Sequence, residues 1–97
     1  MIIIAGSLRL AADDRARYLA AVADVAPAAR RAPGCLDFVQ APDPADPERI
    51  LVFERWESDA DVERFRTSGD RDEPQPELPP LQDADVHRYR IASVEAP

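Results

Sequence analysis

The stretch "CLDFVQAPDPADPERILVFERW", residues 35–56, decides the fold because its pattern predicts two strands joined by a turn. Residues 49–56 are dense in β-branched and aromatic side chains, which is typical of a strand. Residues 35–41 alternate well enough for another strand, and residues 42–47 are rich in turn-forming proline and aspartate. Because the link is short, we predict an antiparallel hairpin. Its first strand would hold Cys35, Asp37 and Val39 on one side, and Leu36 and Phe38 on the other.

The residues before this hairpin predict a strand and a helix. Residues 2–10 are short and rich in β-branched side chains, which favours a strand. Residues 12–32 begin with acidic residues, end with arginines and carry apolar residues at helical spacing. Pro27 removes one backbone donor, so we expect this helix to kink there or to split into two pieces. Pro33 and Gly34 then end the helix.

The residues after the hairpin predict a second helix and a last strand. Residues 58–65 form the helix, and Ser58 with Asp61 resembles a capping box. Residues 70–82 are rich in proline and therefore predict a loop. Residues 85–94 alternate in polarity and predict the last strand.

The predicted order is β-α-β-β-α-β, which indicates an α+β fold of the ferredoxin-like type with an antiparallel sheet and its helices on one face. We expect residues 1–97 to form a single domain. Two of the strands are apolar on both sides; residues 2–10 carry Ile2, Ile4 and Leu8 on one side, and Ile3, Ala5 and Ser7 on the other. Because a bare apolar sheet face is unusual in a monomer, we predict a homodimer in which a second copy covers it.

The composition argues against several classes of partner. The formal net charge is -7, from 19 acidic and 12 basic residues, which argues against nucleic acid and anionic membrane. The N-terminal residues lack the basic and long apolar segments of a signal peptide or membrane span, so we expect a cytoplasmic protein. One cysteine allows no internal disulfide.

Three stretches in this order carry a resemblance to a known family: "PGCLDF" (33–38), "DPERILVFERWES" (46–58) and "SDADVERF" (58–65). Together with the length and element order, they make residues 1–68 similar to the antibiotic biosynthesis monooxygenase domain family. The resemblance implies a ferredoxin-like protomer that forms a dimeric α/β barrel. It also implies a range of activities. Some members oxidise polyketide phenols or quinols without metal or flavin, and others degrade heme.

The family's functional residues are only partly matched. By motif, the asparagine of the heme-degrading members falls at Ser7 and their tryptophan at Phe65, and no histidine lies in residues 66–80. Many quinol-type members carry histidines near the positions of Phe65 and Asp70, and this chain has neither. We therefore expect no heme, metal, flavin or nucleotide cofactor. Two functions stay open: a cofactor-independent monooxygenase that uses molecular oxygen on an aromatic or quinol-type molecule, and a non-catalytic dimeric ligand-binding or accessory protein.

Cofactor-free oxygenation needs an apolar aromatic pocket and a group that removes a phenolic proton. The only histidine, His87, is the natural general base, although a surface histidine would serve no such role. We expect the central charges Asp37, Glu54 and Arg55 to pair with one another or across the dimer. We expect Cys35 to be a buried, unreactive thiol. The candidate pocket residues, which as a group could also be plain core, are Ser7, Tyr18, Phe38, Trp56 and Phe65.

Overall fold

The computed structural model describes residues 1–68 and 77–97, so most of the predicted proline-rich loop lies outside the described residues. The predicted ferredoxin-like α+β fold is confirmed, with the first helical segment divided in two. The elements in chain order are β1 (Ile2–Arg9), α1 (Ala12–Ala21), α2 (Val25–Arg30), β2 (Cys35–Pro42), β3 (Arg49–Trp56), α3 (Asp59–Thr67) and β4 (Asp83–Arg90).

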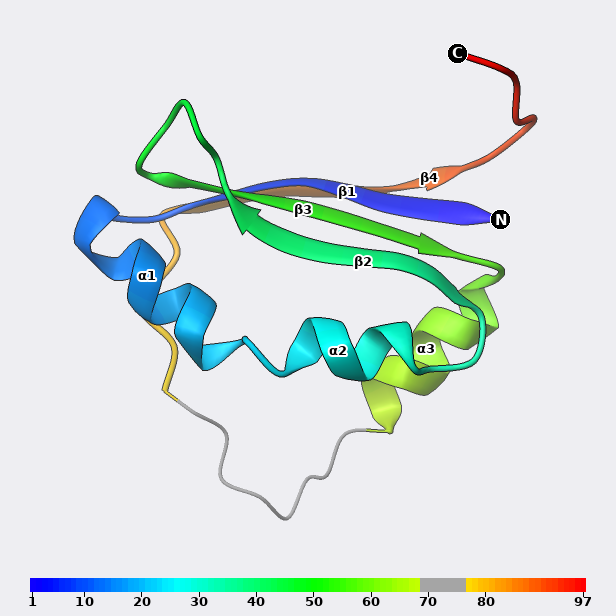
Figure 1. The fold of residues 1–97 in the computed structure, drawn as a ribbon, viewed down its shortest axis with the longest axis horizontal. Coiled ribbons are helices and arrows are strands. Elements are labelled where there is room, and N and C mark those ends of the chain that lie inside the picture. The colour runs from blue at the N-terminus through cyan, green and yellow to red at the C-terminus, as the bar shows by residue number, and fades with distance from the viewer. Residues whose placement is uncertain (69–76) are drawn as a thin grey trace.

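The four strands found in the described residues form one antiparallel sheet in the order β2-β3-β1-β4. The predicted hairpin is present as β2 and β3, and β1 pairs with both β3 and β4. All described helices lie on the same side of this sheet (Figure 1). We call that side of the sheet the covered face and the other side the open face. None of these helices is long and apolar enough to cross a membrane.

The predicted helix over residues 12–32 is split into two pieces, one of the two outcomes expected from Pro27. α1 ends at Ala21, α2 begins at Val25, and Pro27 lies in the first turn of α2. A continuous helix would need a hydrogen bond from the nitrogen of Pro27 to the carbonyl of Ala23, which proline cannot make. In a first turn the missing donor does not matter, because the N–H groups there have no helical carbonyl four residues earlier to bond to. The break therefore lies about one turn before the proline.

Two strands also differ from the expectation. A bulge in β2 shifts the register between Cys35 and Asp37. As a result Cys35 packs against the core on the covered face, whereas the expected alternation placed it with Asp37 and Val39. The last strand runs from Asp83 to Arg90 rather than over residues 85–94, because its pairing with β1 stops where β1 begins.

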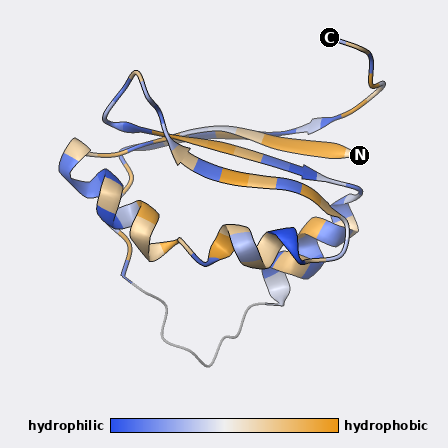
Figure 2. Ribbon diagram, in the orientation of Figure 1, coloured by the Kyte–Doolittle hydropathy of each residue, from blue (hydrophilic) through white to orange (hydrophobic). Residues whose placement is uncertain are grey.

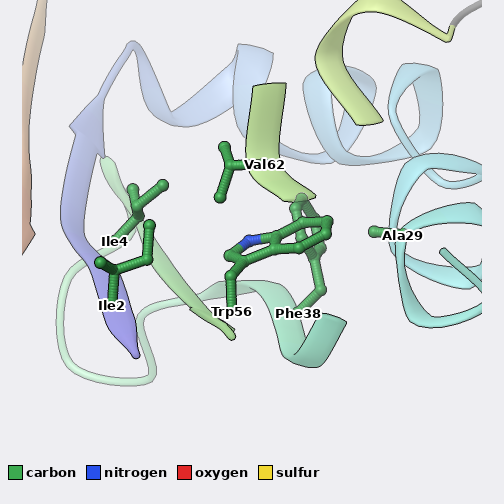
Figure 3. Packing of buried hydrophobic residues seen from close by; sticks show 6 residues of the cluster. All are labelled: Ile2, Ile4, Ala29, Phe38, Trp56 and Val62. Atoms are coloured by element: carbon green, nitrogen blue, oxygen red, sulfur yellow. The ribbon is translucent and has the colours of Figure 1, made fainter. Parts of the chain in front are cut away.

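The core between the covered face and the helices consists of two clusters. The first surrounds the fully buried Trp56 and takes residues from the sheet and from α2 and α3 (Figure 3). The second lies under α1, around Leu10 and Ile50. Between the two clusters β1 contributes only Gly6, where an added Cβ would lie 1.9 Å from the carbonyl oxygen of Asp85. The members of the first cluster are Ile2, Ile4, Ala29, Phe38, Trp56 and Val62, and those of the second are Leu8, Leu10, Tyr18, Ile50 and Val52.

The open face carries apolar side chains without any helix above it. Phe53 is 39% exposed, and it lies between Val39 on β2 and Ala5 on β1, which is followed by His87 on β4. Polar and apolar segments follow one another along β2, whereas the start of β1 is apolar throughout, as the colouring of the sheet shows (Figure 2). The exposed large apolar residues of this face are Val39, Leu51, Phe53 and Tyr89.

Two polar junctions hold the connections in place. Arg15 of α1 donates from Nη1 to the carbonyl oxygens of Asp43, Asp46 and Arg49, at 3.2, 2.8 and 3.4 Å, and so ties the β2–β3 connection to the helix. Ser58 caps α3 as predicted, since its hydroxyl accepts from the backbone N–H of Asp61 at 3.2 Å.

Candidate functional site

Three of the five predicted pocket residues meet on the covered face. The ring of Phe65, on α3, lies 5.5 Å from that of Trp56 and 6.2 Å from that of Phe38, centre to centre. The pair of phenylalanines is edge-to-face, at 65°. The alternation of β2 and β3 places Phe38 and Trp56 on this face, and the helical spacing of α3 adds Phe65. These residues form what we call the aromatic cluster.

Glu54 is a carboxylate beside this aromatic cluster. It lies opposite Ile4 on β1 and Phe38 on β2, and its Oε1 accepts a hydrogen bond of 3.0 Å from the indole nitrogen of Trp56. Burial raises the pKa of Glu54, while the Trp56 hydrogen bond and the charges of Arg66 and Arg88 act in the opposite direction. The covered face therefore holds a carboxyl group that retains its proton to a higher pH than an exposed glutamate.

Of the three central charges expected to pair, Asp37 and Arg55 do so and Glu54 does not. Arg55 and Asp37 form an ion pair on the open face, with Nε and Nη2 of the arginine 3.0 and 2.9 Å from Oδ2. Glu54 instead shares the covered face with Trp56, two residues along β3. That i, i+2 spacing of Glu and Trp was the signal in the sequence that could have identified the pair.

The remaining candidates do not join the aromatic cluster. Tyr18 belongs to the second core cluster, under α1. Ser7 lies on the open face, opposite Leu51 and Asp85. His87 is also on the open face, where its Nε2 lies 2.7 Å from Oδ1 of Asp85. The sheet thus separates Ser7 and His87 from the aromatic cluster, and the five residues do not form a single pocket.

A cavity of about 210 Å³ opens where the helical layer breaks between α1 and α2. Its wall on the sheet side comes from β2, and one of the side chains there, Gln40, has a buried Oε1 without a hydrogen-bond partner. The lining residues are Leu19, Val22, Ala23, Ala26, Gln40 and Pro42.

Cys35 lies at the edge of the first core cluster, against the covered face. Burial raises the pKa of its thiol, and the nearby carboxylates of Glu54 and Asp37 raise it further. Its Sγ contacts the carbonyl oxygen of Asp37 at 3.6 Å. A thiol in this environment holds its proton and is a weak nucleophile, in line with the unreactive role expected from the sequence.

The covered face does not fit a heme held by an imidazole. The one histidine in the sequence, His87, is exposed on the open face. Within residues 1–68 and 77–97, no three His, Cys, Asp or Glu side chains converge as a metal site would require. Among the described residues, the covered face thus offers neither an imidazole nor a cluster of metal ligands.

Comparison with known proteins identifies the family. The model of the antibiotic biosynthesis monooxygenases matches residues 1–74. No curated protein matches the sequence.

Several solved structures are similar to this chain. A Deinococcus radiodurans protein assigned to the antibiotic biosynthesis monooxygenases is 19% identical, with a TM-score of 0.77 over 99% of this chain and 97% of that one. A Pseudomonas aeruginosa protein is 30% identical, with a TM-score of 0.59 over 94% and 93%. The heme-degrader MhuD from Mycobacterium tuberculosis, with two hemes bound in its active site, is 18% identical, with a TM-score of 0.64 over 99% and 100%. On the match of the family model to most of its length, the chain belongs to the antibiotic biosynthesis monooxygenase family.

Proposed function

We propose that this protein is a cofactor-independent monooxygenase that oxidises a small aromatic molecule of the phenol or quinol type. Membership of the family supports this proposal. The observation that carries it is the Glu54 carboxylate, held beside the aromatic cluster with a raised pKa. A general base works best when its pKa approaches the operating pH, and burial moves Glu54 in that direction.

The chemistry divides between the substrate and the protein. Glu54 accepts the phenolic proton, and the resulting phenolate supplies the electrons that reduce molecular oxygen. One oxygen atom forms a bond to a ring carbon in place of its C–H bond, and the other oxygen atom leaves as water with that hydrogen and the phenolic proton. The protein's part is to exclude water, to hold the ring against Phe38 and Phe65, and to keep the carboxylate oriented through the indole N–H of Trp56.

Oxygen uptake by the purified protein tests this proposal. We expect uptake with members of a panel of hydroquinones and anthrones in metal-free buffer. Glu54→Gln, which keeps the hydrogen bond from Trp56, should lower kcat by about 10²-fold or more, the usual contribution of a general base. Glu57→Gln, at an exposed position next to the same strand, is the matched control and should retain activity. An absence of uptake with the whole panel contradicts the proposal.

A non-catalytic ligand-binding or accessory role is the second candidate. The observation in its favour is that Trp56 is fully buried and Phe38 is 4% exposed, so the aromatic cluster is packed like ordinary core. Under this alternative the protein binds phenolic ligands with no oxygen uptake, and Glu54→Gln leaves their affinity unchanged.

His87 stays a proposal as a base, and it would require a ligand on the open face. The variant His87→Ala separates the two locations. Unchanged oxygen uptake in His87→Ala assigns the chemistry to the covered face, whereas loss of uptake with normal folding assigns it to the open face, where Ser7 also lies.

We also propose that the protein is a homodimer in which two open faces meet. The support is the row of apolar side chains that no helix of the same chain covers. An isologous two-fold arrangement is the simplest way to cover both faces at once.

A further inference from the structure

The aromatic cluster is closed in this structure. Trp56 is fully buried and Phe38 is 4% exposed, although the proposed function requires a substrate ring to reach Phe38 and the Glu54 carboxylate. Protein interiors are close-packed, so a ring can enter only if an element above the cluster moves. One helix of the covered face must therefore uncover it.

α3 is the helix that lies over Trp56 (Figure 3). It contributes the fully buried Val62 and the half-buried Phe65 to the first core cluster, and its other residues are half-buried or exposed. α2, by contrast, is also bound to β2 through Arg30, whose Nε donates to the carbonyl oxygen of Phe38 at 3.0 Å. An element with few buried apolar contacts opens at a lower free energy than the rest of a fold, which singles out α3.

One flank of α3 is held to β4 by ion pairs. Nη1 of Arg88 lies 2.6 Å from Oδ1 of Asp59, and its Nη2 lies 3.2 Å from Oε1 of Glu63. Nη1 of Arg90 lies 2.7 Å from Oδ2 of Asp59. We call these three contacts the α3–β4 ion pairs. The side chains of Asp59 and Glu63 are 41% and 58% exposed, so salt screens their charges and each pair is weak.

The α3–β4 ion pairs lie on the side of the helix that faces Glu54. Arg88 lies opposite Ile4, and Ile4 lies opposite Glu54, so the three residues share one row across the covered face. At about 100° per residue, Phe65 lies on one side of Val62 on α3, and the two acidic residues of the ion pairs lie on the other. Separation of these pairs would therefore release the flank of α3 next to Glu54.

We propose that α3 is a lid over the aromatic cluster and Glu54, and that the α3–β4 ion pairs keep it closed. When the pairs separate, α3 moves away from β4, and a flat ring reaches Glu54 from the β4 side. The open state is a minor one, because it exposes Val62 and Phe65 to water. The role of the lid in turnover rests on the proposed function, whereas its opening can be measured without a substrate.

Quenching of tryptophan fluorescence by acrylamide tests the lid, because Trp56 is the only tryptophan in the chain. Acrylamide is uncharged, so salt acts on the quenching only through the protein. The wild type should be quenched slowly at about 20 mM salt and more rapidly at about 0.5 M salt, where the ion pairs are screened. Arg88→Met removes two of the three pairs. It should raise the quenching rate at low salt by about threefold or more and remove most of the salt dependence.

Three further variants serve as controls. Arg64→Met removes an ion pair with Asp61 within the same helix, and it should leave the quenching rate unchanged. Arg15→Met acts on the β2–β3 connection, and it should leave the rate unchanged too. Arg90→Met removes only the third α3–β4 pair, so it should raise the rate less than Arg88→Met does, and it replaces Arg88→Met if that variant is poorly folded.

A quenching rate that responds neither to Arg88→Met nor to salt overturns the proposal. An equal rise in Arg64→Met or Arg15→Met also overturns it, since quenching would then follow a general loss of stability. Oxygen uptake separates this proposal from the previous one. A wild type without uptake contradicts the proposed function alone, and the quenching rates still decide whether α3 is a lid.

Discussion

At the scale of single residues, the covered face carries two polar side chains where a core would ordinarily be apolar. Glu54 is held by the indole N–H of Trp56, and Gln40 lines the cavity at the helix break. The two occupy neighbouring strands, with Glu54 opposite Phe38 and Gln40 opposite Val52. Polar groups under a helical layer reduce stability, so their presence marks the part of the molecule where function is to be sought.

The raised pKa of Glu54 predicts a specific dependence of stability on pH. A carboxyl group whose pKa is higher in the folded than in the unfolded state makes the folded protein bind its proton more tightly. Its contribution to the free energy of unfolding is therefore largest below the ordinary value of 4.5 and is lost as the pH rises through the native pKa. Glu54→Gln has no titrating carboxyl group at this position, so its free energy of unfolding should not show this decrease with pH.

Urea unfolding of the wild type and of Glu54→Gln, from about pH 4 to pH 8, measures this effect. The free energy of unfolding of the variant minus that of the wild type should rise across this window and then level off. A difference that falls with rising pH would show that the folded state favours the ionised carboxylate.

At the scale of elements, the connections depend on close contacts between segments distant in sequence. The turn at Gly34 passes the N-terminus of α3, and its φ of +83° lies in the left-handed region that favours glycine. A Cβ there would lie 2.2 Å from the carboxylate of Asp61, one residue of the α3 cap. The end of α2, the start of β2 and the start of α3 are thus fixed at one point.

Gly34→Ala should destabilise the protein by at least about 1–2 kcal/mol, the cost of a left-handed alanine alone. The contact with Asp61 adds to this cost. In an Asp61→Ala background, which removes the carboxylate but keeps the Cβ at 2.6 Å, the same change should cost less. Chemical denaturation of the four proteins of this cycle provides the measurement. A neutral effect of Gly34→Ala in the wild type would contradict the geometry of the turn.

Arg15 is expected to stabilise the β2–β3 connection more than any surface ion pair of the same helix. Arg15→Met keeps the apolar stem but removes the donor that the carbonyl oxygens of Asp43, Asp46 and Arg49 share. The last two keep a backbone N–H, so we expect a cost of about 1–3 kcal/mol, mainly from the carbonyl of Asp43. Arg17→Met removes an exposed pair with Asp14 and should cost less than about 0.5–1 kcal/mol. Similar losses for the two variants, measured by urea unfolding, would show that the Arg15 contacts do not stabilise the fold.

At the scale of the whole molecule, the sheet has helices on one face and exposed apolar side chains on the other. Phe53 lies near the centre of the open face, since β3 is an inner strand of the sheet. A charge introduced there would lie inside the proposed dimer interface without disturbing the core of the protomer.

We expect light scattering or sedimentation to give a dimer for the wild type at micromolar concentration. Phe53→Arg should give a folded monomer. Leu78→Arg places the same charge on an exposed leucine outside the sheet, and it should leave the dimer intact. A stable monomer for the wild type at this concentration would refute the proposed interface.

Much of the fold follows from the sequence because hydrophobic periodicity and turn residues are local signals. The hairpin, the element order and the Ser58 cap are confirmed. The bulge at Cys35 involves a single residue and cannot be recognised in the alternating pattern of the sequence. The face of the sheet predicted for Cys35 is therefore wrong. In a continuous helix the nitrogen of Pro27 would have to donate to the carbonyl of Ala23, which it cannot do. The helix therefore breaks near Ala23, about one turn before the proline.

The candidate site was harder to predict than the fold, since it depends on which face of the sheet each residue occupies. Phe38 and Trp56 lie in the same cluster because both project from the strands onto the covered face. Ser7 lies on the other side of the sheet, where the alternation along β1 places it with Ile3. Glu54 was assigned to ion pairing, because a charge in a strand usually indicates exposure.

The inner position of β1 has a consequence for how the chain acquires its structure. β1 precedes all other elements in the chain, yet both of its neighbours, β3 and β4, come later, and β4 is the last element of all. During synthesis the apolar residues at the start of β1 therefore stay unpaired until β3 has been made, and one edge of β1 stays open until β4 follows. Such non-local pairing slows folding and leaves an apolar, aggregation-prone segment exposed to other chains. Folding yield at high expression should thus be limited by how soon β4 reaches β1.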